Sequence, residues 1–573
     1  MAKAILFTGG SVFDGTAFLA PGTSVLVSGG RVAAVGADLD PGGPGFADTD
    51  IVDLAGGTLL PGFLDAHAHP VFGGIQLLGC DLTEAETAQE YLAIVARFAA
   101  ANPDLDWITG GGWGMTAFPG GIPTAAQLDS VVAGRPVILT NRDGHGAWVN
   151  SKAMELAGIT RDTLDPADGR VERDAAGEPV GMLQEGAMNL VRRLLPEDTD
   201  EDRYRGLLAA QDYLLSLGIT GWQDAMVGRG FGDADAATAY HQAASAGTLR
   251  ADVVGALWWQ RHVGLEQLPE LLHRRAHDGR DGFRLTSVKM MLDGVAENHT
   301  AAMLDPYLDG HGCATENSGL DFIDPAELPR YVTALDQAGF QVHFHALGDR
   351  AVRNALNAVA AARAARTTDT ARAARTTDTA RAARTASTAS PGGTIRHHLA
   401  HLQVVHPADI ARFAELGATA NIQPLWATAE EQMTELTIPF LGETRSAWQY
   451  PFGGLVASGA HLAAGSDWPV SSPNPLLGIH VAVNRSTPDS ADAPFLPDQA
   501  IPLATALAAY TSGTATVNGV DGEAGRIRPG YLASFAVTDA DLAAIGGHEI
   551  CAASVTQTWV RGELAYQKGS NGD

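Results

Sequence analysis

The segment GFLDAHAHP, residues 62–70, combines a short apolar run with polar side chains at its end. Similar strand-like runs recur along the chain at residues 218–226, 285–294, 340–349, 419–424 and 461–470. Helical patterns such as PAELPRYVTALDQAG (325–339) and HPADIARFAELG (406–417) lie between them. Repeated alternation of strand and helix is typical of a parallel α/β sheet, and the length of this region favours an eight-stranded barrel over an open sheet. We therefore predict a (β/α)8 TIM barrel.

Short β-branched runs at both ends of the chain predict a second, smaller domain. Residues 4–15 and 24–36 suggest a hairpin, and residues 525–541 and 553–566 have the same strand-and-turn character. We expect a small β-sandwich built from residues 1–57 and 506–573, with the barrel at residues 58–505. Residues 71 to about 215 are too many for one crossover, so they predict an inserted subdomain over the barrel mouth.

A low-complexity segment occupies residues 362–388. The nonapeptide ARAARTTDT occurs at residues 362–370, again at 371–379, and begins a third time at Ala380. It could be a basic interaction arm or a duplicated extension of the preceding helix. Because it follows a helix and precedes a strand, we expect it on the barrel face away from the active site, where insertions are tolerated.

Composition and charge restrict the kind of partner. The 573 residues carry a formal net charge of −28, which argues against binding to nucleic acid or an anionic membrane and favours a small-molecule substrate. The three well-separated cysteines fit free thiols in a reducing compartment. We find no apolar run of 18 residues and no signal-peptide pattern. We expect a cytoplasmic protein that forms a homo-oligomer, a dimer.

Histidines gather at the ends of the predicted strands. His67 and His69 are two residues apart, so both rings point to one face of a strand, the face of Asp65. This pair could be half of a divalent-metal site or simply two packed histidines. Later strand ends supply further candidates, namely Lys289, His343, His345, His397, His398, His401 and Asp467. Because the strands of a parallel barrel end at one rim, a metal site explains this pattern better than core packing.

The motifs PGFLDAHAHP, HALGDRAV, HLAHLQVVHPADIARFAELG and GSDWPVSSPNP resemble the amidohydrolase superfamily. With NSKAMELAGIT in the insert and GRIRPGYLASFAV near the end, the chain is similar to amidohydrolase family 3, which includes N-substituted formamide deformylases. The resemblance covers nearly the whole chain. It implies one or two divalent metals, Zn²⁺ or similar, with a carboxylated lysine as bridging ligand and a strand-eight aspartate that also relays a proton. The implied metal ligands are His67, His69, Lys289, His345, His401 and Asp467.

Lys289 is one of only four lysines, and it interrupts the apolar pattern LTSVKMMLDG. A lysine amine that is neutral in a desolvated pocket can react with carbon dioxide to give a carbamate, an anionic oxygen ligand. Arginine cannot do this. The alternative is a buried ion pair between Lys289 and Asp293 or Asp467.

Several other polar or aromatic residues are candidates for substrate binding: His145, Glu297, His299, His398 and Trp113. His145 lies in NRDGHGAWVNS, which could be a rim contact or a capped turn. Glu297 and His299 follow Lys289 and could line the mouth or be solvated loop residues. Many relatives have Arg-Ile-Glu-His before the strand-six ligand, whereas this chain has His398-Leu399-Ala400-His401, which adds an imidazole. Trp113 could form an apolar pocket or pack against a helix.

These features together predict a metal-dependent amidohydrolase that cleaves a carbon–nitrogen bond, other than a peptide bond, in a small N-substituted amide or formamide. The metal would activate water, and Asp467 would move the proton to the departing amine. A cyclic amide, imide or ester hydrolase could use the same site. A non-catalytic ligand-binding barrel is the alternative from another class, and the presence of Asp467 and of the paired histidines argues against it.

Overall fold

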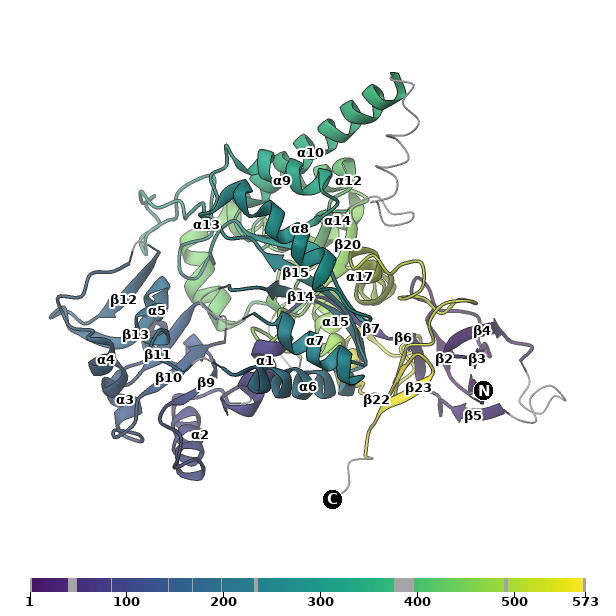
Figure 1. Ribbon diagram of the computed structural model, residues 1–573, viewed down its shortest axis with the longest axis horizontal. Coiled ribbons are helices and arrows are strands. Elements are labelled where there is room, and N and C mark those ends of the chain that lie inside the picture. Colours follow the sequence, from purple (N-terminus) through teal and green to yellow (C-terminus); the bar gives the residue numbers. More distant parts are fainter. Residues whose placement is uncertain are drawn as a thin grey trace.

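The computed structural model describes residues 3–39, 49–83, 85–142, 144–166, 168–196, 198–230, 235–375, 396–488 and 493–569. Its centre is a sheet of eight strands in which all neighbouring pairs are parallel (Figure 1). In sheet order these are β7 (Phe63–Ala68), β14 (Ile219–Val227), β15 (Asp252–Trp258), β16 (Phe283–Met291), β17 (Gln341–Ala346), β18 (His398–His401), β19 (Thr419–Ile422) and β20 (His461–Ala464).

The sheet closes where β7 meets the segment that follows β20. The Asp467 amide donates to the His67 carbonyl at 2.7 Å, and the His69 amide donates to the Trp468 carbonyl at 2.8 Å. Gly465 permits this approach, because a Cβ atom there would lie 2.6 Å from the His67 nitrogen. The predicted (β/α)8 barrel is therefore confirmed.

Helices surround the barrel, and their apolar faces join the strands in one large hydrophobic core. Helix α9, for example, buries Leu328, Val332 and Leu335. The helices between and after the strands are α1 (Pro70–Leu78), α6 (Asp200–Ser216), α7 (Ala237–Ala246), α8 (Leu268–His277), α9 (Leu328–Gln337), α10 (Asp349–Arg375), α12 (Pro407–Leu416), α13 (Ile438–Ser446), α14 (Phe452–Ala457), α15 (Pro475–Asn484), α16 (Leu503–Ala508) and α17 (Thr514–Val517).

The insert between α1 and α6 forms a sheet of its own, on the left in Figure 1. Its strands, in sheet order, are β12 (Gly169–Arg173), β13 (Pro179–Glu185), β11 (Gly146–Val149), β10 (Val137–Asn141), β9 (Ile108–Trp113) and β8 (Cys80–Asp81). Helices α2 (Ala88–Ala101), α3 (Ala125–Asp129), α4 (Ser151–Ala157) and α5 (Asn189–Arg192) accompany it. Two apolar clusters, separate from the barrel core, stabilise this subdomain.

Two further sheets are built from the ends of the chain, and the second of them combines strands from both ends. One sheet has the order β4 (Arg31–Gly36), β3 (Ser24–Ser28), β1 (Ala4–Thr8) and β5 (Thr49–Asp53). The other has the order β2 (Ser11–Val12), β6 (Thr58–Pro61), β21 (Phe535–Thr538), β22 (Val555–Val560) and β23 (Glu563–Gln567). The ring of Phe7 packs edge-on against Phe535 and Trp559, at centroid distances of 5.3 and 5.2 Å. The predicted β-sandwich and insert are thus both present.

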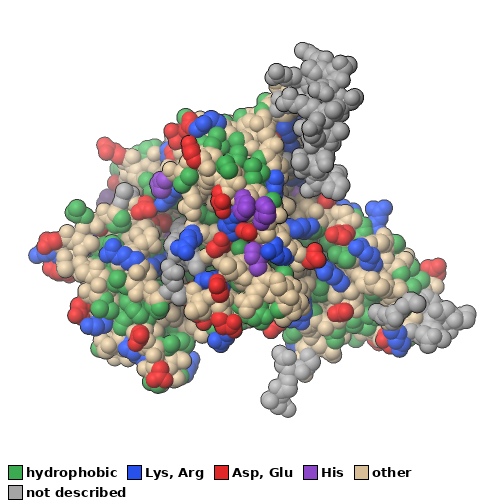
Figure 2. Space-filling view, in the orientation of Figure 1, with side chains coloured by type: hydrophobic (Ala, Val, Ile, Leu, Met, Phe, Trp, Pro, Cys, Tyr) green, Lys and Arg blue, Asp and Glu red, His purple; other side chains and the backbone are tan. Residues whose placement is uncertain are grey.

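Helix α10 begins after β17 at the barrel mouth and runs toward the opposite end. Its last turns project from the body of the molecule (Figure 1). Residues 362–375 of the predicted repeat therefore continue this helix, whereas residues 376–388 lie outside the described residues. On the face shown in Figure 2, acidic and basic side chains are interspersed over the described surface. None of the described helices is both long and apolar enough to span a membrane.

Candidate metal centre

The six residues expected to bind metal lie together at the carboxyl ends of five barrel strands. The Lys289 Nζ atom is 3.1 Å from Nε2 of His67, which in turn is 3.2 Å from Oδ1 of Asp467. The same Asp467 oxygen is 3.0 Å from Nε2 of His69. On the other side, the ring of His401 lies 4.5 Å from that of His345 and 4.8 Å from that of His67, between centroids. Among the described residues, His67, His69 and Asp467 offer ligand atoms that all lie within 4.8 Å of one another, and Lys289, His345 and His401 lie beside this group.

A chain of hydrogen bonds determines which nitrogen of His67 faces this group. The amide of Gln223 donates to Asn518 at 3.2 Å, so its Oε1 accepts from Nδ1 of His343 at 2.6 Å. His343 Nε2 must then accept from Nδ1 of His67 at 2.9 Å. This assignment gives His67 its proton on Nδ1 and directs the Nε2 lone pair toward Lys289 and Asp467, as a metal ligand requires.

His345 is oriented by a buried carboxylate. Its Nδ1 lies 3.3 Å from Oδ1 of Asp293. The Asp293 carboxylate is itself fixed by the backbone amides of Ala302, Leu347 and Gly348 at 2.9 to 3.1 Å. Carboxylate–imidazole pairs of this kind orient histidines that bind metals, because they leave Nε2 for the ion.

His401 has two buried ring nitrogens that form no hydrogen bond among the described residues. Its ring stacks on Trp426 with an interplanar angle of 4°, which fixes its plane. Buried nitrogen atoms are normally hydrogen-bonded, so an unsatisfied ring amid other donors fits a metal ligand. The backbone is left-handed at both His401 (φ 80°) and Asp467 (φ 58°), a conformation that costs free energy and is concentrated at functional sites.

Lys289 is 3% exposed, and no carboxylate of the described residues forms an ion pair with it. Burial lowers the pKa of its amine to about 7, while the charge of Asp467 acts in the opposite direction. The ion pair considered from the sequence is therefore not formed. A substantial fraction of the amine is neutral near pH 7, which is the form that reacts with carbon dioxide.

Burial and mutual repulsion keep the imidazoles neutral. Desolvation and the neighbouring Lys289 lower the pKa of His67 to about 3, and desolvation also lowers the pKa of His345 and His401. Burial alone would raise the pKa of Asp467, but the hydrogen bond with Nε2 of His69 opposes this shift and helps to hold the pKa below its usual value. Neutral nitrogens around one carboxylate form a donor set that suits a divalent cation such as zinc.

Asp65 has a different role from its neighbours on the strand. Its carboxylate accepts from the amide of His67 at 2.9 Å and from the amide and hydroxyl of Ser466. Burial raises the pKa of this carboxyl to about 6, although these hydrogen bonds oppose the shift. Asp65 therefore joins β7 to the segment after β20 and holds the backbone that carries His67 and Asp467.

The insert brings a second polar pair to the mouth. His145 Nδ1 lies 2.9 Å from a carboxylate oxygen of Glu185, and the ring of His145 is 6.4 Å from that of His345 between centroids. Burial would raise the pKa of Glu185, but His145 and hydrogen bonds from Asn298 and Thr300 lower it. The sequence indicated His145 but not Glu185, which is far from it in the chain.

The other substrate-binding candidates lie at different depths. Glu297 accepts from Gln403 at 3.2 Å and from Thr437 at 2.8 Å, which joins three loops of the mouth. His299 packs on Tyr307 and Phe440 beside this loop. His398 is fully buried and lies one layer below the metal ligands, with its ring 4.0 Å from that of His343.

Trp113 does not join the metal centre. Its indole is fully buried in the apolar core of the insert, where it packs on Phe118 and Trp148 and donates to the carbonyl of Leu139. Sequence reasoning also gave no role to Gln223, Asp293 or His343 as orienting groups. The signal for Gln223 was its place beside Asp224 in the strand 219–227, most of whose other side chains are apolar.

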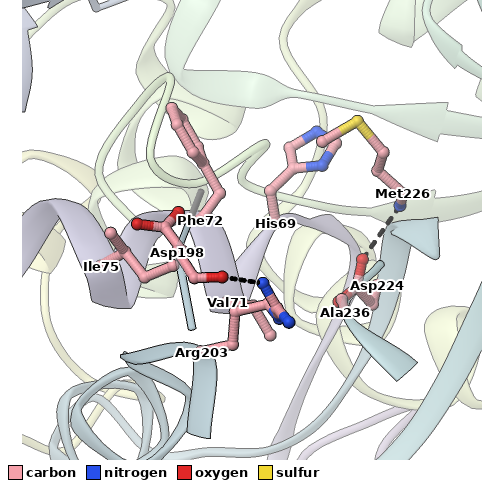
Figure 3. Close-up of a pocket in the computed structure, with 9 residues that line it drawn as sticks. All are labelled: His69, Val71, Phe72, Ile75, Asp198, Arg203, Asp224, Met226 and Ala236. Atoms are coloured by element: carbon pink, nitrogen blue, oxygen red, sulfur yellow. Dashed lines mark hydrogen bonds between the residues drawn. The ribbon is translucent and has the colours of Figure 1, made fainter. Parts of the chain in front are cut away.

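Two neighbouring spaces lie beside α1, and one of them borders His69. A small cavity of about 40 Å³, drawn in Figure 3, is bounded by His69, Phe72, Asp198 and Met226. Phe72, Ile75 and Asp198 also border a larger cleft of about 470 Å³ between α1 and the insert. That volume lies in the range of sites for small molecules.

Comparison with known proteins shows matches along almost the whole chain. The model of the amidohydrolase family matches residues 50–566. Protein LONG AFTER FAR-RED 3 of Arabidopsis thaliana is 29% identical over 579 residues, 98% of this chain and 91% of that protein. The N-substituted formamide deformylase of Arthrobacter pascens is 27% identical over 556 residues, 95% of each. An uncharacterised metal-dependent hydrolase from Pyrococcus horikoshii has the same fold, with a TM-score of 0.69 at 23% identity over 95% of this chain and 99% of that one.

Proposed function

Because the chain belongs to the amidohydrolase family, we propose that it hydrolyses the carbon–nitrogen bond of a small N-substituted amide, with formamides as the first class to test. The observation that carries this proposal is the convergence of imidazoles, a neutral lysine and a carboxylate at one rim of the barrel. The name of the Arthrobacter pascens relative supports the choice of formamides.

A divalent metal, zinc or similar, fits this donor set because His401 is buried without hydrogen bonds and His67 and His345 are held with Nε2 toward the centre. We assign its binding to His67, His69, Lys289, His345, His401 and Asp467. When bound, such a metal acts as a Lewis acid that makes water a nucleophile near neutral pH and polarises a carbonyl group. One or two ions per chain are compatible with six ligands.

Lys289 would bind metal as a carbamate. Its neutral amine attacks carbon dioxide, a nitrogen–carbon bond forms, and one proton is released. The product carries two oxygens where the amine carried none. Since the Lys289 Nζ atom lies beside Nε2 of His67, these oxygens would add anionic ligands to the imidazoles of the centre.

Asp467 would move the proton during hydrolysis. Its carboxylate faces the centre beside His67 and His69, and the hydrogen bond with His69 favours its ionised form. We assign it to accept a proton as water attacks the carbonyl carbon and then to deliver that proton to the nitrogen as the carbon–nitrogen bond breaks. Delivery is needed because amines leave poorly unless they are protonated.

The proposal is tested by metal analysis together with an activity screen. Protein purified without chelator should contain roughly one or two divalent ions per chain, and it should release amine from N-substituted formamides. Acylated amines, cyclic amides, imides and esters in the same screen decide between the possible substrate classes. Activity that persists in protein without detectable metal would disprove the proposal, and so would metal-loaded protein that hydrolyses no compound of these classes.

A further inference from the structure

The larger cleft beside α1 has the composition of a ligand site and takes no part in the metal centre. Its volume is about 470 Å³, and none of the six proposed metal ligands lines it. One wall is helix α1, with Phe72 and Ile75, and another wall belongs to the insert (Figure 1). The proposed amide hydrolysis gives no role to this cleft, so a ligand bound there would be a second one.

The floor of the cleft is built from strand β10. Ile138 and Thr140 are two residues apart, so both side chains lie on the same face of the strand, and they are only 3% and 8% exposed. Trp107 and Leu195 add partly buried apolar surface on the side of the insert. An apolar group bound here would therefore lose much of its contact with water, which favours binding.

A positive charge lies beside this floor. Arg192 is the last residue of helix α5, and its Nη2 donates to the Thr140 hydroxyl at 3.2 Å. Arg192 is partly buried, and it forms no ion pair with any carboxylate of the described residues. A guanidinium offers several N–H donors, and the described residues use only one of them, so the others can bind an anion.

Other charged residues line the cleft closer to the solvent. They are three aspartates and a second arginine, all of them exposed: Asp104, Asp106, Asp198 and Arg229. Charges in contact with water are strongly screened, whereas a partly buried charge acts in a lower dielectric. Arg192 at the floor is therefore the charge that selects a ligand held in the cleft.

We propose that this cleft is a second small-molecule site, which binds an organic anion with an apolar body. The carboxylate or sulfonate of the ligand accepts hydrogen bonds from Arg192. Its apolar part covers Ile138 and packs against Phe72 and Ile75 of α1. The site does not depend on the reaction proposed for the metal centre.

The charge of the ligand follows from the cost of covering a guanidinium. A neutral ligand of the same shape would remove water from the free donors of Arg192 without replacing it, and an anion avoids this cost. A cation would in addition be repelled by the same group. An anion should therefore bind at least about tenfold more tightly than its neutral counterpart.

Three probes of similar shape test the charge of the ligand: naphthalene-2-sulfonate, naphthalene-2-methanol and naphthalene-2-methylammonium. Each probe is titrated calorimetrically into the metal-loaded protein. The sulfonate should bind most tightly, with an affinity at least about tenfold above that of the alcohol. Equal binding of the sulfonate and the alcohol, tightest binding of the ammonium, or no binding of any probe would overturn the proposal.

Variants of Arg192 test whether its guanidinium provides this preference. Arg192→Leu should lower the affinity for the sulfonate by at least about tenfold, to that for the alcohol, whereas Arg192→Lys should retain part of the preference because it keeps a positive charge. The matched control is Arg193→Leu, at the exposed neighbouring arginine, which should bind the sulfonate like the parent protein. An unchanged affinity in Arg192→Leu would show that the anion binds elsewhere.

Thr109→Trp tests the cleft by filling it while Arg192 stays in place. Thr109 is an exposed residue of β9 that lines the cleft, so the larger side chain occupies the cleft and leaves the core intact. The variant should lose binding of the sulfonate, with metal content and thermal stability like those of the parent protein. Full binding of the sulfonate to this variant would place the probe at another site, such as the metal centre, and would disprove the proposal.

Discussion

His343 Nε2 accepts a hydrogen bond from Nδ1 of His67 at 2.9 Å, directly beneath the candidate metal centre. The two rings are nearly perpendicular, with an interplanar angle of 85°. On the other side of the His343 ring, Oε1 of Gln223 accepts a hydrogen bond from Nδ1 at 2.6 Å. A glutamine that accepts from one histidine thus determines the tautomer of the next, and through it the direction in which His67 offers its lone pair.

We predict that His343→Phe weakens metal binding by about 10- to 100-fold, as expected when a group that orients a metal-bound histidine is lost. The phenyl ring fills the space but cannot accept the proton of His67. Competition with a fluorescent zinc chelator measures the affinity. His398→Phe is the matched control, because its ring lies in the same layer without a hydrogen bond to His67. If both variants lose the same affinity, packing and not the hydrogen bond explains the effect.

Asp467→Asn should separate metal binding from turnover. The other five ligands remain, so much of the metal should stay bound, while turnover should fall by roughly 10²-fold or more because the amide cannot accept the proton. Metal content and the rate of amine release, measured on one preparation, give both values. Turnover at the parent rate would mean that another group carries the proton.

The metal-free protein should become more stable as pH rises above 7. Burial lowers the pKa of Lys289 from its ordinary value to about 7. Between this pH and about 10 the unfolded chain keeps its proton on Lys289 whereas the folded chain has lost it, so the free energy of unfolding rises with pH. The gain is at most roughly 4 kcal/mol, because each pKa unit corresponds to about 1.4 kcal/mol.

Denaturant unfolding from pH 7 to 10, in chelator and in buffer free of carbon dioxide, measures this gain. Lys289→Met removes the titrating group while it retains the length of the side chain. The difference between the parent protein and Lys289→Met should therefore change with pH over this window and stay constant below it. A difference that is independent of pH would show that Lys289 keeps an ordinary pKa in the fold.

Deletion of residues 371–379 should leave kcat/KM within about threefold of the parent value. Helix α10 starts at Asp349 beside the mouth and carries residues 371–375 toward the opposite end of the barrel, away from the metal centre. The deletion removes one complete copy of ARAARTTDT, so the repeat pattern of the remaining sequence is preserved. Loss of activity in a protein with unchanged thermal stability would indicate that the segment takes part in the active site.

The sequence predicts the barrel because its strand and helix patterns depend on local spacing. Two histidines two residues apart share a face of a strand, and parallel strands end at one rim, so pattern and fold class place His67, His69 and Asp467 at that rim, whereas the choice of the six ligands comes from the family resemblance. The spacing indicates on which face of a strand a side chain lies, but not how deep in the barrel it lies. His343 shares the face of His345, yet it lies one layer below and serves as an acceptor for His67.

Contacts between segments that are far apart in the sequence could not be predicted from local spacing. Glu185 meets His145 because two antiparallel strands of the insert pair at Gly146 and Gln184, and no local pattern gives that register. Trp113 is a candidate that the structure places elsewhere. An aromatic side chain at a strand end could face either the mouth or the insert core, and the sequence does not distinguish the two. In the structure, the Trp113 ring packs on Phe118 and Trp148 and so lies in the core of the insert.

The last prediction concerns the chemical identity of Lys289. If its role were only to place a positive charge beside Asp467, Lys289→Arg would keep that charge and retain partial function. The structure places its Nζ atom against a histidine nitrogen and lowers its pKa to about 7, which suits a neutral amine. We therefore expect Lys289→Arg to lose metal and activity together, since arginine cannot form a carbamate and its larger guanidinium would crowd His67.

Lys289→Ala tests the carbamate more directly, because it leaves a cavity beside His67 into which a small carboxylate could enter. Acetate or propionate would supply the two oxygens that the carbamate is proposed to supply, whereas the amines ethylamine and propylamine would supply none. We predict that Lys289→Ala is depleted of metal and nearly inactive, and that added metal with a short carboxylic acid restores metal binding and measurable turnover. Rescue by the amines but not by the acids would mean that the nitrogen itself is what the centre needs. Full metal content and activity in Lys289→Ala without any additive would show that Lys289 is not a ligand, and the low pKa of its amine would then be a consequence of burial alone.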